Sequence, residues 1–379
     1  MKANNILALL SLLTLSALLS GCNEPVKTKH NPLKLLADNN EHYAQASVHN
    51  KIIFPNAHAA KKAYRQEWWY LTATLETEQG QSFASQWTLF RRSVADKHWY
   101  FAHAALADTN AHSAAYRNGR EDLGNVSLTT KPFTARIDDW LWQSSSELLP
   151  AKLIYGSAVG SINQQAGDNL IVSSSDKAAA IKATTPWQAE LNLSTTEAFF
   201  LQGEQGYSVK HPKLAIASHY YSQPFIEVSG KIYWQGQWQK VTGNAWFDRE
   251  WASQMLGPDQ QGWDWFSLRL NEDTALMVFR VRSSVEDYLY ASIMLRGGEI
   301  RTISSTDIEL ISQKASTDSP YPSSFSLVIA QQGIDITVQV VNKQQIMRFG
   351  IEYFEGMVTF KGSHQGQGFV EMTGYNDNF

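Results

Sequence analysis

The sequence predicts an all-β protein built from two similar β-barrel units. Aromatic residues make up 12% of the 379 residues, and from Phe54 onward short runs of β-branched and aromatic residues alternate with turn residues. Such residues favour pleated sheets and apolar pockets over helical bundles. An aromatic run near the start also recurs in the second half of the chain. The length is more typical of two hydrophobic cores than of one.

The N-terminus has the pattern of a lipoprotein signal peptide. The apolar stretch at residues 6–19 is too short to span a bilayer comfortably, and Leu19-Ser20-Gly21 leads directly into Cys22. We therefore expect residues 1–21 to be removed and Cys22 to carry a lipid; an ordinary signal peptide with an accidental cysteine is the alternative. Asn23 follows the cysteine. By resemblance to Gram-negative lipoproteins, this favours an envelope protein that is lipid-anchored at the outer membrane and faces the periplasm.

Composition excludes several classes of site and partner. Cys22 is the only cysteine, which rules out disulfides, cysteine-ligated zinc, iron–sulfur clusters and a cysteine nucleophile. The net charge is −4 and no run of Lys or Arg occurs, which argues against nucleic acid as a partner. No zinc-protease, Walker or dinucleotide motif is present, and the histidines are scattered. We therefore expect neither a metal nor a cofactor.

The mature chain is expected to begin with a polar tether and to continue in strands. Residues 22–50 are mostly polar and contain prolines, so we expect them to link the lipid to the folded domains. Further on, hydrophobic and polar residues alternate at residues 334–340, as in a strand with one buried face. Turn residues at 331–333 and 235–237 each separate two strand-like runs, and they predict hairpins.

A weak internal repeat supports two units of the same kind. The run WWYLTATL at residues 68–75 aligns with WDWFSLRL at residues 263–270, and each run leads to a second strand that ends in arginine. Duplication of a β-barrel domain explains the spacing and the length together; chance similarity between aromatic strands is the alternative. Pro224 lies between strand-like segments and marks the predicted boundary, which gives domains at residues 51–222 and 223–379.

One segment, residues 246–268, interleaves tryptophans and phenylalanines with carboxylates. So many large rings are unlikely to be exposed together on a surface, and unpaired charges are costly to bury in a plain core. We therefore expect part of this segment to line a cavity.

Motifs from both halves of the chain form a recognisable set: EWWY at residues 67–70, FAH at residues 101–103, His219-x-Tyr221, and WFDREW at residues 246–251 followed by GWDWFSL at residues 262–268. Together with a C-terminal segment whose glycines are typical of strand bends, they resemble the family of carotenoid 1,2-hydratases and AttH-like secreted proteins over residues 54–375. The resemblance implies two lipocalin-like, calycin-type β-barrels in tandem, in agreement with the repeat.

The resemblance also implies catalytic candidates. In the hydratases, a His-x-Trp pair and a Tyr-x-Asp pair form the proposed acid–base site, and here they fall on His219-x-Tyr221 and Trp246-x-Asp248. The ionisable residues match, whereas each aromatic residue is replaced by another. The catalytic candidates are therefore Asp248, His219, Tyr221 and Trp246.

Burial indicates what these residues would do. A carboxyl group in an apolar pocket keeps its proton, so Asp248 would protonate an alkene while His219 orients the attacking water or accepts its proton. Aromatic faces would stabilise the resulting cation by on the order of 1 kcal/mol each. A structural alternative is equally open, in which Asp248 and Arg249 form a salt-bridged turn at the end of a barrel.

Further residues are candidates for ligand binding or for structure. Glu67 is expected to pair with an arginine such as Arg91 and to close one barrel, and His103 to be a hydrogen-bonded pocket histidine. Glu250 and Asp264 are expected to accept hydrogen bonds from backbone or indole N–H groups rather than to take part in catalysis. The candidates for lining a binding cavity are Glu67, Trp69, His103, Trp251, Trp263 and Trp265.

Two classes of function follow from these expectations. In the first, the protein binds or hands over a hydrophobic or amphiphilic small molecule such as a lipid, beside an ABC-type exporter as the AttH resemblance suggests. In the second, it is a hydratase or hydrolase that acts on an isoprenoid-like substrate with Asp248 and His219. Binding requires only an apolar cavity. Catalysis also requires Asp248 and His219 to face each other inside it.

Overall fold

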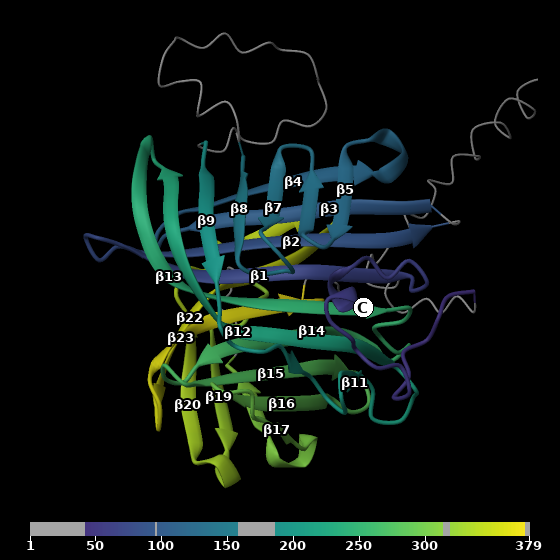
Figure 1. Cartoon of the computed structure of the whole chain (residues 1–379). Helices are drawn as coiled ribbons and strands as arrows, with labels where there is room; N and C mark the ends of the chain where they lie inside the picture. Colours follow the sequence, from purple (N-terminus) through teal and green to yellow (C-terminus); the bar gives the residue numbers. More distant parts are fainter. Residues whose placement is uncertain (1–41, 95–96, 158–185, 314–318, 376–379) are drawn as a thin grey trace, which may run out of the picture. The chain divides into compact units, whose positions relative to one another are not determined.

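The computed structural model describes residues 42–94, 97–157, 186–313 and 319–375. All of them belong to one compact unit, Leu33–Phe379, whose regular structure is almost entirely β-sheet (Figure 1). The predicted signal peptide, residues 1–21, and most of the predicted tether, residues 22–50, lie outside the described residues. The described helices are short 3-10 turns, and none of them has the length and apolar character needed to cross a membrane.

The first sheet has 13 strands in the order β4-β3-β2-β1-β13-β12-β9-β8-β7-β6-β5, with β10 and β11 paired to β12. The 3-10 turns η1 (Asn56–His58) and η2 (Glu121–Leu123) accompany it. Its strands are β1 (Gln66–Thr77), β2 (Ser82–Val94), β3 (Lys97–Ala107), β4 (His112–Arg120), β5 (Val126–Thr130), β6 (Phe133–Ile137), β7 (Trp140–Ser144), β8 (Ala151–Gly156), β9 (Gln188–Ser194), β10 (Phe200–Leu201), β11 (Tyr207–Val209), β12 (Ala217–Trp234) and β13 (Gln237–Ala252).

The second sheet has ten strands in the order β17-β16-β15-β14-β23-β22-β20-β19-β18, with β21 paired to β22. The 3-10 turns η3 (Ser305–Asp307) and η4 (Ala330–Gln332) accompany it. Its strands are β14 (Gln260–Arg269), β15 (Thr274–Ser283), β16 (Tyr288–Leu295), β17 (Ile300–Ile303), β18 (Glu309–Ser312), β19 (Ser324–Ile329), β20 (Ile334–Val340), β21 (Ile346–Phe349), β22 (Ile351–Gly362) and β23 (Gly366–Thr373).

The two sheets repeat one strand order. β1 and β14 each open their sheet, pair with the next strand on one side, and pair on the other side with the last strand, β13 or β23. The first sheet forms a nearly closed barrel and the second a half-barrel. The predicted all-β class with two tandem barrel units is therefore confirmed, and the two copies of the sequence repeat fall on β1 and β14.

Both predicted hairpins are present. β12 and β13 are joined by Gln235 and Gly236, whose φ angles of 48° and 88° suit a tight turn that follows the twist of the strands. β19 and β20 are joined by η4 and Gly333, which has a φ of 64°. Alternation of hydrophobic and polar residues, combined with turn residues, was a sufficient signal for these pairs.

The predicted domain boundary between residues 222 and 223 lies inside β12. This strand pairs with β13 on both sides of Pro224, and the register shifts between Gln223 and Ile226. A proline lacks the N–H of a regular ladder but is tolerated at a bulge, so Pro224 bends the strand without ending it. By sheet membership, the change from one unit to the next comes between Ala252 and Gln260.

Apolar side chains gather in three main places. One cluster fills the first barrel, where Trp69, Trp87 and Trp142 are among the fully buried side chains. A second cluster fills the second unit around Phe266 and Phe325. A third cluster takes residues from both sheets and lies between them. Strands that contribute to a barrel core and to this third cluster are buried on both faces.

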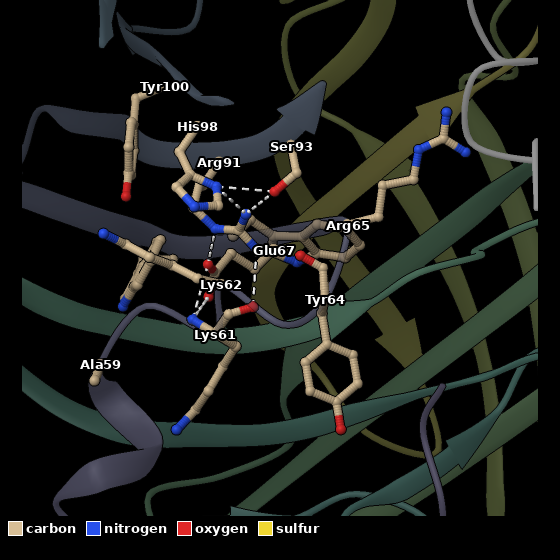
Figure 2. A network of polar contacts seen from close by, with 12 residues as sticks. Ala59, Lys61, Lys62, Tyr64, Arg65, Glu67, Arg91, Ser93, His98 and Tyr100 are labelled. Atoms are coloured by element: carbon tan, nitrogen blue, oxygen red, sulfur yellow. Dashed lines mark hydrogen bonds and ion pairs between the residues drawn. The ribbon is translucent and has the colours of Figure 1, made fainter. Parts of the chain in front are cut away.

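A buried ion cluster fixes the strands at one end of the first barrel (Figure 2). The guanidinium groups of Arg91 and Arg249 both contact the carboxylate of Glu67, and all three side chains are 0% exposed. The backbone N–H of Lys61 donates to both Glu67 oxygens, at 3.0 and 2.9 Å. Arg249 also lies 3.9 Å from the centre of the Trp69 ring. The predicted pairing of Glu67 with Arg91 is confirmed, with Arg249 as a second partner.

We predict that Glu67→Ala lowers the free energy of unfolding by about 3–5 kcal/mol, because it leaves two buried guanidinium groups without their carboxylate. Glu76 lies on the same strand but is exposed, so Glu76→Ala should change stability by less than about 0.5 kcal/mol. Urea denaturation followed by tryptophan fluorescence measures both. Equal effects of the two substitutions would contradict a structural role for the cluster.

Candidate functional site

The central strands of the first sheet present different residues to two environments. Successive residues of a strand point to opposite faces. Along β13, Phe247 and Trp251 belong to the core of the first barrel, whereas Trp246 belongs to the cluster between the sheets and Asp248 lies on the same face as Trp246. The aromatic and acidic segment found in the sequence therefore lines both the barrel and the space between the sheets.

The sheet separates the two predicted catalytic groups. On β12, His219 lies opposite Trp251, and the two rings are 5.4 Å apart on the barrel side. Ser222 lies opposite Asp248 and donates a hydrogen bond to it at 2.5 Å on the other side. His219 and Asp248 thus face different environments, and the acid–base pair predicted between them is not formed.

The first barrel contains the predicted residues His219 and Tyr221. His219 is 1% exposed, and neither of its ring nitrogens has a hydrogen-bond partner in the described structure. Burial, helped by the nearby Lys61, lowers the pKa of His219 to about 4, so the ring is neutral at pH 7. The Tyr221 hydroxyl lies 2.6 Å from Nδ1 of His58. Three predicted cavity residues lie in the same barrel: Glu67, Trp69 and Trp251.

Asp248 is buried and accepts three side-chain hydrogen bonds. The Tyr220 hydroxyl donates to Oδ2 at 2.7 Å, while the Ser222 hydroxyl and the Trp246 indole donate to Oδ1 at 2.5 and 2.8 Å. Burial raises the pKa of Asp248 to about 7, although the three donors act in the opposite direction. A carboxyl group with this pKa is protonated in part of the molecules at neutral pH, which suits a group that gives and takes protons.

The alternative of a salt bridge between Asp248 and Arg249 is wrong. The two residues are neighbours in one strand, so their side chains leave it on opposite faces. Arg249 binds Glu67 on the barrel side, and Asp248 has only neutral donors around it.

Aromatic rings from both sheets cover Asp248. Trp246 and Trp265 meet edge to face with ring centres 6.1 Å apart, and Tyr70 meets Trp265 in the same way at 5.3 Å. The indole N–H of Trp265 donates to the Tyr220 hydroxyl at 3.1 Å. A chain of hydrogen bonds therefore runs from Trp265 in the second sheet through Tyr220 to the Asp248 carboxyl.

Three further carboxyl groups lie in the same layer between the sheets. Glu250 is paired with Lys210 at 2.9 Å. Glu371 accepts a hydrogen bond from the indole of Trp263 at 2.7 Å, and Glu355 lies opposite Glu371 on the adjacent strand. We call the four carboxyl groups the acid layer: Asp248 and Glu250 from β13, Glu355 from β22 and Glu371 from β23.

Burial favours the protonated forms of Glu371 and Glu355 in the acid layer. Burial raises the pKa of Glu371 to about 7; the hydrogen bond from Trp263 lowers this pKa, and the nearby Glu250 and Asp248 raise it. Burial and Glu371 raise the pKa of Glu355 well above its usual range. Carboxyl groups this close to one another in a dry environment cannot all ionise. Proton exchange among them is therefore available to a ligand bound in the layer.

The repeat of the sheets also repeats the acid layer. The sequence repeat aligns Tyr70 with Trp265. Tyr70 lies opposite Asp248 on the neighbouring strand, and Trp265 lies opposite Glu371. Asp248 and Glu371 therefore occupy equivalent positions in the two units, and both have a pKa of about 7.

Sequence reasoning missed Glu355 and Glu371. The glycines around them led to an interpretation of this segment as strand bends only. The available signal was the period of two in β22, where Tyr353, Glu355 and Met357 point to one face, so that an acid sits between two buried apolar side chains. A charged residue in that position has to be paired, protonated or functional.

Other predicted residues have mainly structural contacts. His103 lies 3.0 Å from the Tyr353 hydroxyl through Nδ1, and burial lowers its pKa to about 3, in line with a bonded pocket histidine. Asp264 binds Arg280 at 2.6 Å and accepts a hydrogen bond from Tyr375 at 2.9 Å. Asp264 is bound by Arg280 and Tyr375, and Glu250 by Lys210. The expectation that both acids accept hydrogen bonds from backbone or indole N–H groups is therefore wrong. A charged partner stabilises a buried carboxylate more than a neutral one does.

Two other features do not coincide with the acid layer. Among the described residues, no group of three or more His, Cys, Asp or Glu side chains is arranged to hold a metal ion. A hollow of about 490 Å³ lies over β9, β12 and β13, where it is lined by Ser194, Glu227, Val228, Ser229, Thr242, Gly243 and Asn244.

Comparisons with known proteins agree with this architecture. The model of the AttH-like family matches residues 45–375. A crystal structure of a protein from Nitrosomonas europaea described as an AttH is similar, with 28% sequence identity and a TM-score of 0.71 over 88% of this chain and 99% of that one. Kievitone hydratase from Nectria haematococca shares the fold, with 14% identity and a TM-score of 0.61 over 90% of this chain and 98% of that one. No curated protein matches the sequence.

We predict that the wild type loses stability relative to Asp248→Asn as the pH rises from about 4 to about 7. The folded-state pKa of about 7 lies above the ordinary value of the unfolded chain, so folding favours the protonated carboxyl, and this contribution disappears through that window. The full difference is about 4 kcal/mol at most. Urea denaturation of both proteins across this range measures it. A difference that does not change with pH would mean that Asp248 is ionised in the folded protein throughout.

Proposed function

The chain belongs to the AttH-like family, and we propose that it is an enzyme that adds water to, or removes water from, an isoprenoid-like small molecule in the acid layer. The observation that carries this proposal is Asp248, which is buried under aromatic rings, forms no ion pair within the described part of the chain and has a pKa near 7. The fold shared with a hydratase is compatible with the proposal. The partner of Asp248 is taken to be Glu371 in place of His219.

The mechanism begins with the protonated form of Asp248. Its proton moves to one carbon of the alkene, and the other carbon becomes a tertiary cation. The faces of Trp246 and Trp265 stabilise that cation by on the order of 1 kcal/mol or more each, because the layer is buried from bulk solvent. A water molecule adds its oxygen to the cation and releases a proton. Dehydration is the same sequence in reverse.

The released proton needs an acceptor in the same layer. Glu371 has a pKa of about 7 and lies in the position equivalent to Asp248, so its ionised form accepts the proton of the attacking water. The Trp263 indole holds one oxygen of Glu371 at 2.7 Å and orients the carboxyl group. Tyr220 and Ser222 do the same for Asp248. The layer thus supplies one acid and one base from equivalent strands of the two units.

We predict that Asp248→Asn lowers turnover of a short isoprenoid alkene by about 10²–10⁴-fold, because the amide cannot donate the proton, while affinity for the alkene is kept. Incorporation of ¹⁸O from labelled water into the alcohol, followed by mass spectrometry, measures turnover, and quenching of tryptophan fluorescence measures binding. Asp335→Asn is the matched control, because Asp335 is exposed on β20. Unchanged turnover in Asp248→Asn would remove this mechanism.

His219 provides a second comparison. His219→Gln should keep turnover within about threefold, because the side chain lies in the first barrel on the far side of the sheet from Asp248. A loss as large as that of Asp248→Asn would instead mean that both faces of the sheet take part in the reaction.

A binding protein is the second candidate function. His219, buried beside Trp251 with two unpartnered ring nitrogens, favours a polar group of a hydrophobic or amphiphilic ligand inside the first barrel. In this case the protein would carry or hand over a lipid-like molecule. Alkene binding without ¹⁸O incorporation by the wild type would support this function over the enzyme.

We also propose that the protein works while anchored by lipid at Cys22 to the outer membrane, facing the periplasm, with an ABC-type exporter as a partner. This proposal is supported by the lipobox-like sequence and by the AttH family, and it concerns residues outside the described structure. Cells fed an alkyne-labelled palmitate should yield a labelled protein in the membrane fraction, and Cys22→Ala, which removes the only thiol, should abolish the label and release the protein. A labelled Cys22→Ala protein would contradict this site.

A further inference from the structure

In and beside the acid layer, several buried polar groups have no hydrogen-bond partner among the residues that the structure describes. They are the Tyr70 hydroxyl, both amide atoms of Gln86, the Thr88 hydroxyl and both oxygens of Glu355. All four residues are at least nine-tenths buried. Tyr70, Tyr353 and Gln86 lie close enough to Glu355 to lower its pKa somewhat, yet none of the three makes a well-formed hydrogen bond with it. An unmade hydrogen bond on a buried group costs roughly 1–3 kcal/mol, so this concentration requires an explanation.

Strand register places these groups together. Tyr70 on β1 lies opposite Thr88 on β2, and Gln86 is two residues from Thr88, so all three leave the first sheet on one face. It is the face of Asp248, which lies opposite Tyr70 on the other side. Glu355 reaches the same region from the second sheet. The unpartnered groups therefore form a cluster next to the proposed acid.

The rest of the layer is well satisfied. Asp248 has three hydrogen-bond donors, Glu250 has Lys210, and Glu371 has the Trp263 indole. The deficit is confined to the side formed by β1, β2 and β22. The open donors and acceptors on that side are groups that a polar atom of a ligand would satisfy.

We infer that Tyr70, Gln86, Thr88 and Glu355 bind a neutral hydroxyl or carbonyl group of the substrate, next to the alkene held at Asp248. This inference rests on the proposed function and deepens it by naming the substrate class. The substrate is an amphiphile with an apolar body and one uncharged oxygenated end, rather than a plain hydrocarbon or a fatty-acid anion.

The chemistry of these unpartnered groups selects a neutral group. Hydroxyls and an amide offer donors and acceptors together, which a hydroxyl or carbonyl oxygen matches on both counts. An anion would lie among the carboxyl groups of the acid layer. An ammonium group would satisfy the acceptors but would leave the amide N–H groups of Gln86 unpaired. Burial and Glu371 raise the pKa of Glu355, which favours its protonated form, and in that form it adds a donor.

Three probes of one chain length test the inference: 1-decanol, decanoate and decylammonium. Isothermal titration of the full-length protein should show that decanol binds more tightly than either ion. Gln86→Met keeps the size of the side chain but removes its donors and acceptor, and it should weaken decanol binding about tenfold. Gln339→Met, at an exposed position on β20, is the matched control and should leave binding unchanged.

Glu355 gives a sharper comparison. Glu355→Gln imitates the protonated carboxyl and should keep decanol affinity within about threefold, whereas Glu355→Met should weaken it about tenfold. Thr88→Val, which preserves shape, provides the same readout if Gln86→Met does not fold.

Unchanged decanol affinity in Gln86→Met, Thr88→Val and Glu355→Met would overturn the inference and mean that buried water satisfies these groups. Tighter binding of decanoate or decylammonium would overturn it as well. The experiment reads binding and not turnover, so its outcome is independent of the proposed reaction. Asp248→Asn, which is expected to stop turnover, should bind decanol as the wild type does.

Discussion

Burial of the central strands on both faces is the constraint on which this structure depends. β1, β12 and β13 contribute alternate residues to the core of the first barrel and to the cluster between the sheets. In the parts of these strands that are buried on both faces, every charged residue has to find a partner in a dry environment. The partner differs between the faces. On the barrel side, Glu67 has two arginines; on the other side, the carboxyl groups have few cations.

The number of neighbouring cations distinguishes the acids with a structural role from those with a proposed chemical role. Where guanidinium groups compensate the acids, as at Glu67 or at Asp264 with Arg280, the ion clusters stabilise a fixed charge and hold strands together. Burial alone would raise the pKa of Glu67, but the two arginines outweigh it and keep the pKa below its usual range. In the acid layer, protons replace the missing cations, and the pKa of Asp248 rises to about 7. A proton held in this way is mobile, whereas an arginine is not.

The fold could be predicted further than the site. Alternation of residue types and the repeat were enough for the all-β class, the two barrel units and both hairpins, because these depend on local pattern. The association of His219 with Asp248 depends on register between strands, which no spacing within a strand reveals. His219 lies opposite Trp251 and not opposite a residue of the Asp248 face. A shift by one residue would have reversed the outcome. Pro224 marks the predicted domain boundary for a similar reason. Whether a proline ends a strand or only bends it depends on a bulge in the pairing with the neighbouring strand.

The repeat explains why acids from both sheets meet between them. Equivalent residues of β1 and β14, Tyr70 and Trp265, meet across the layer at 5.3 Å, as equivalent residues do near the axis of a symmetric dimer. Such an arrangement brings the equivalent acids Asp248 and Glu371 into one environment. The surroundings of the two acids differ. In the first sheet Thr88 lies opposite Tyr70, whereas at the equivalent position of the second sheet Phe279 lies opposite Trp265. Two equal acids with unequal surroundings are what a reaction needs that uses one as donor and the other as acceptor.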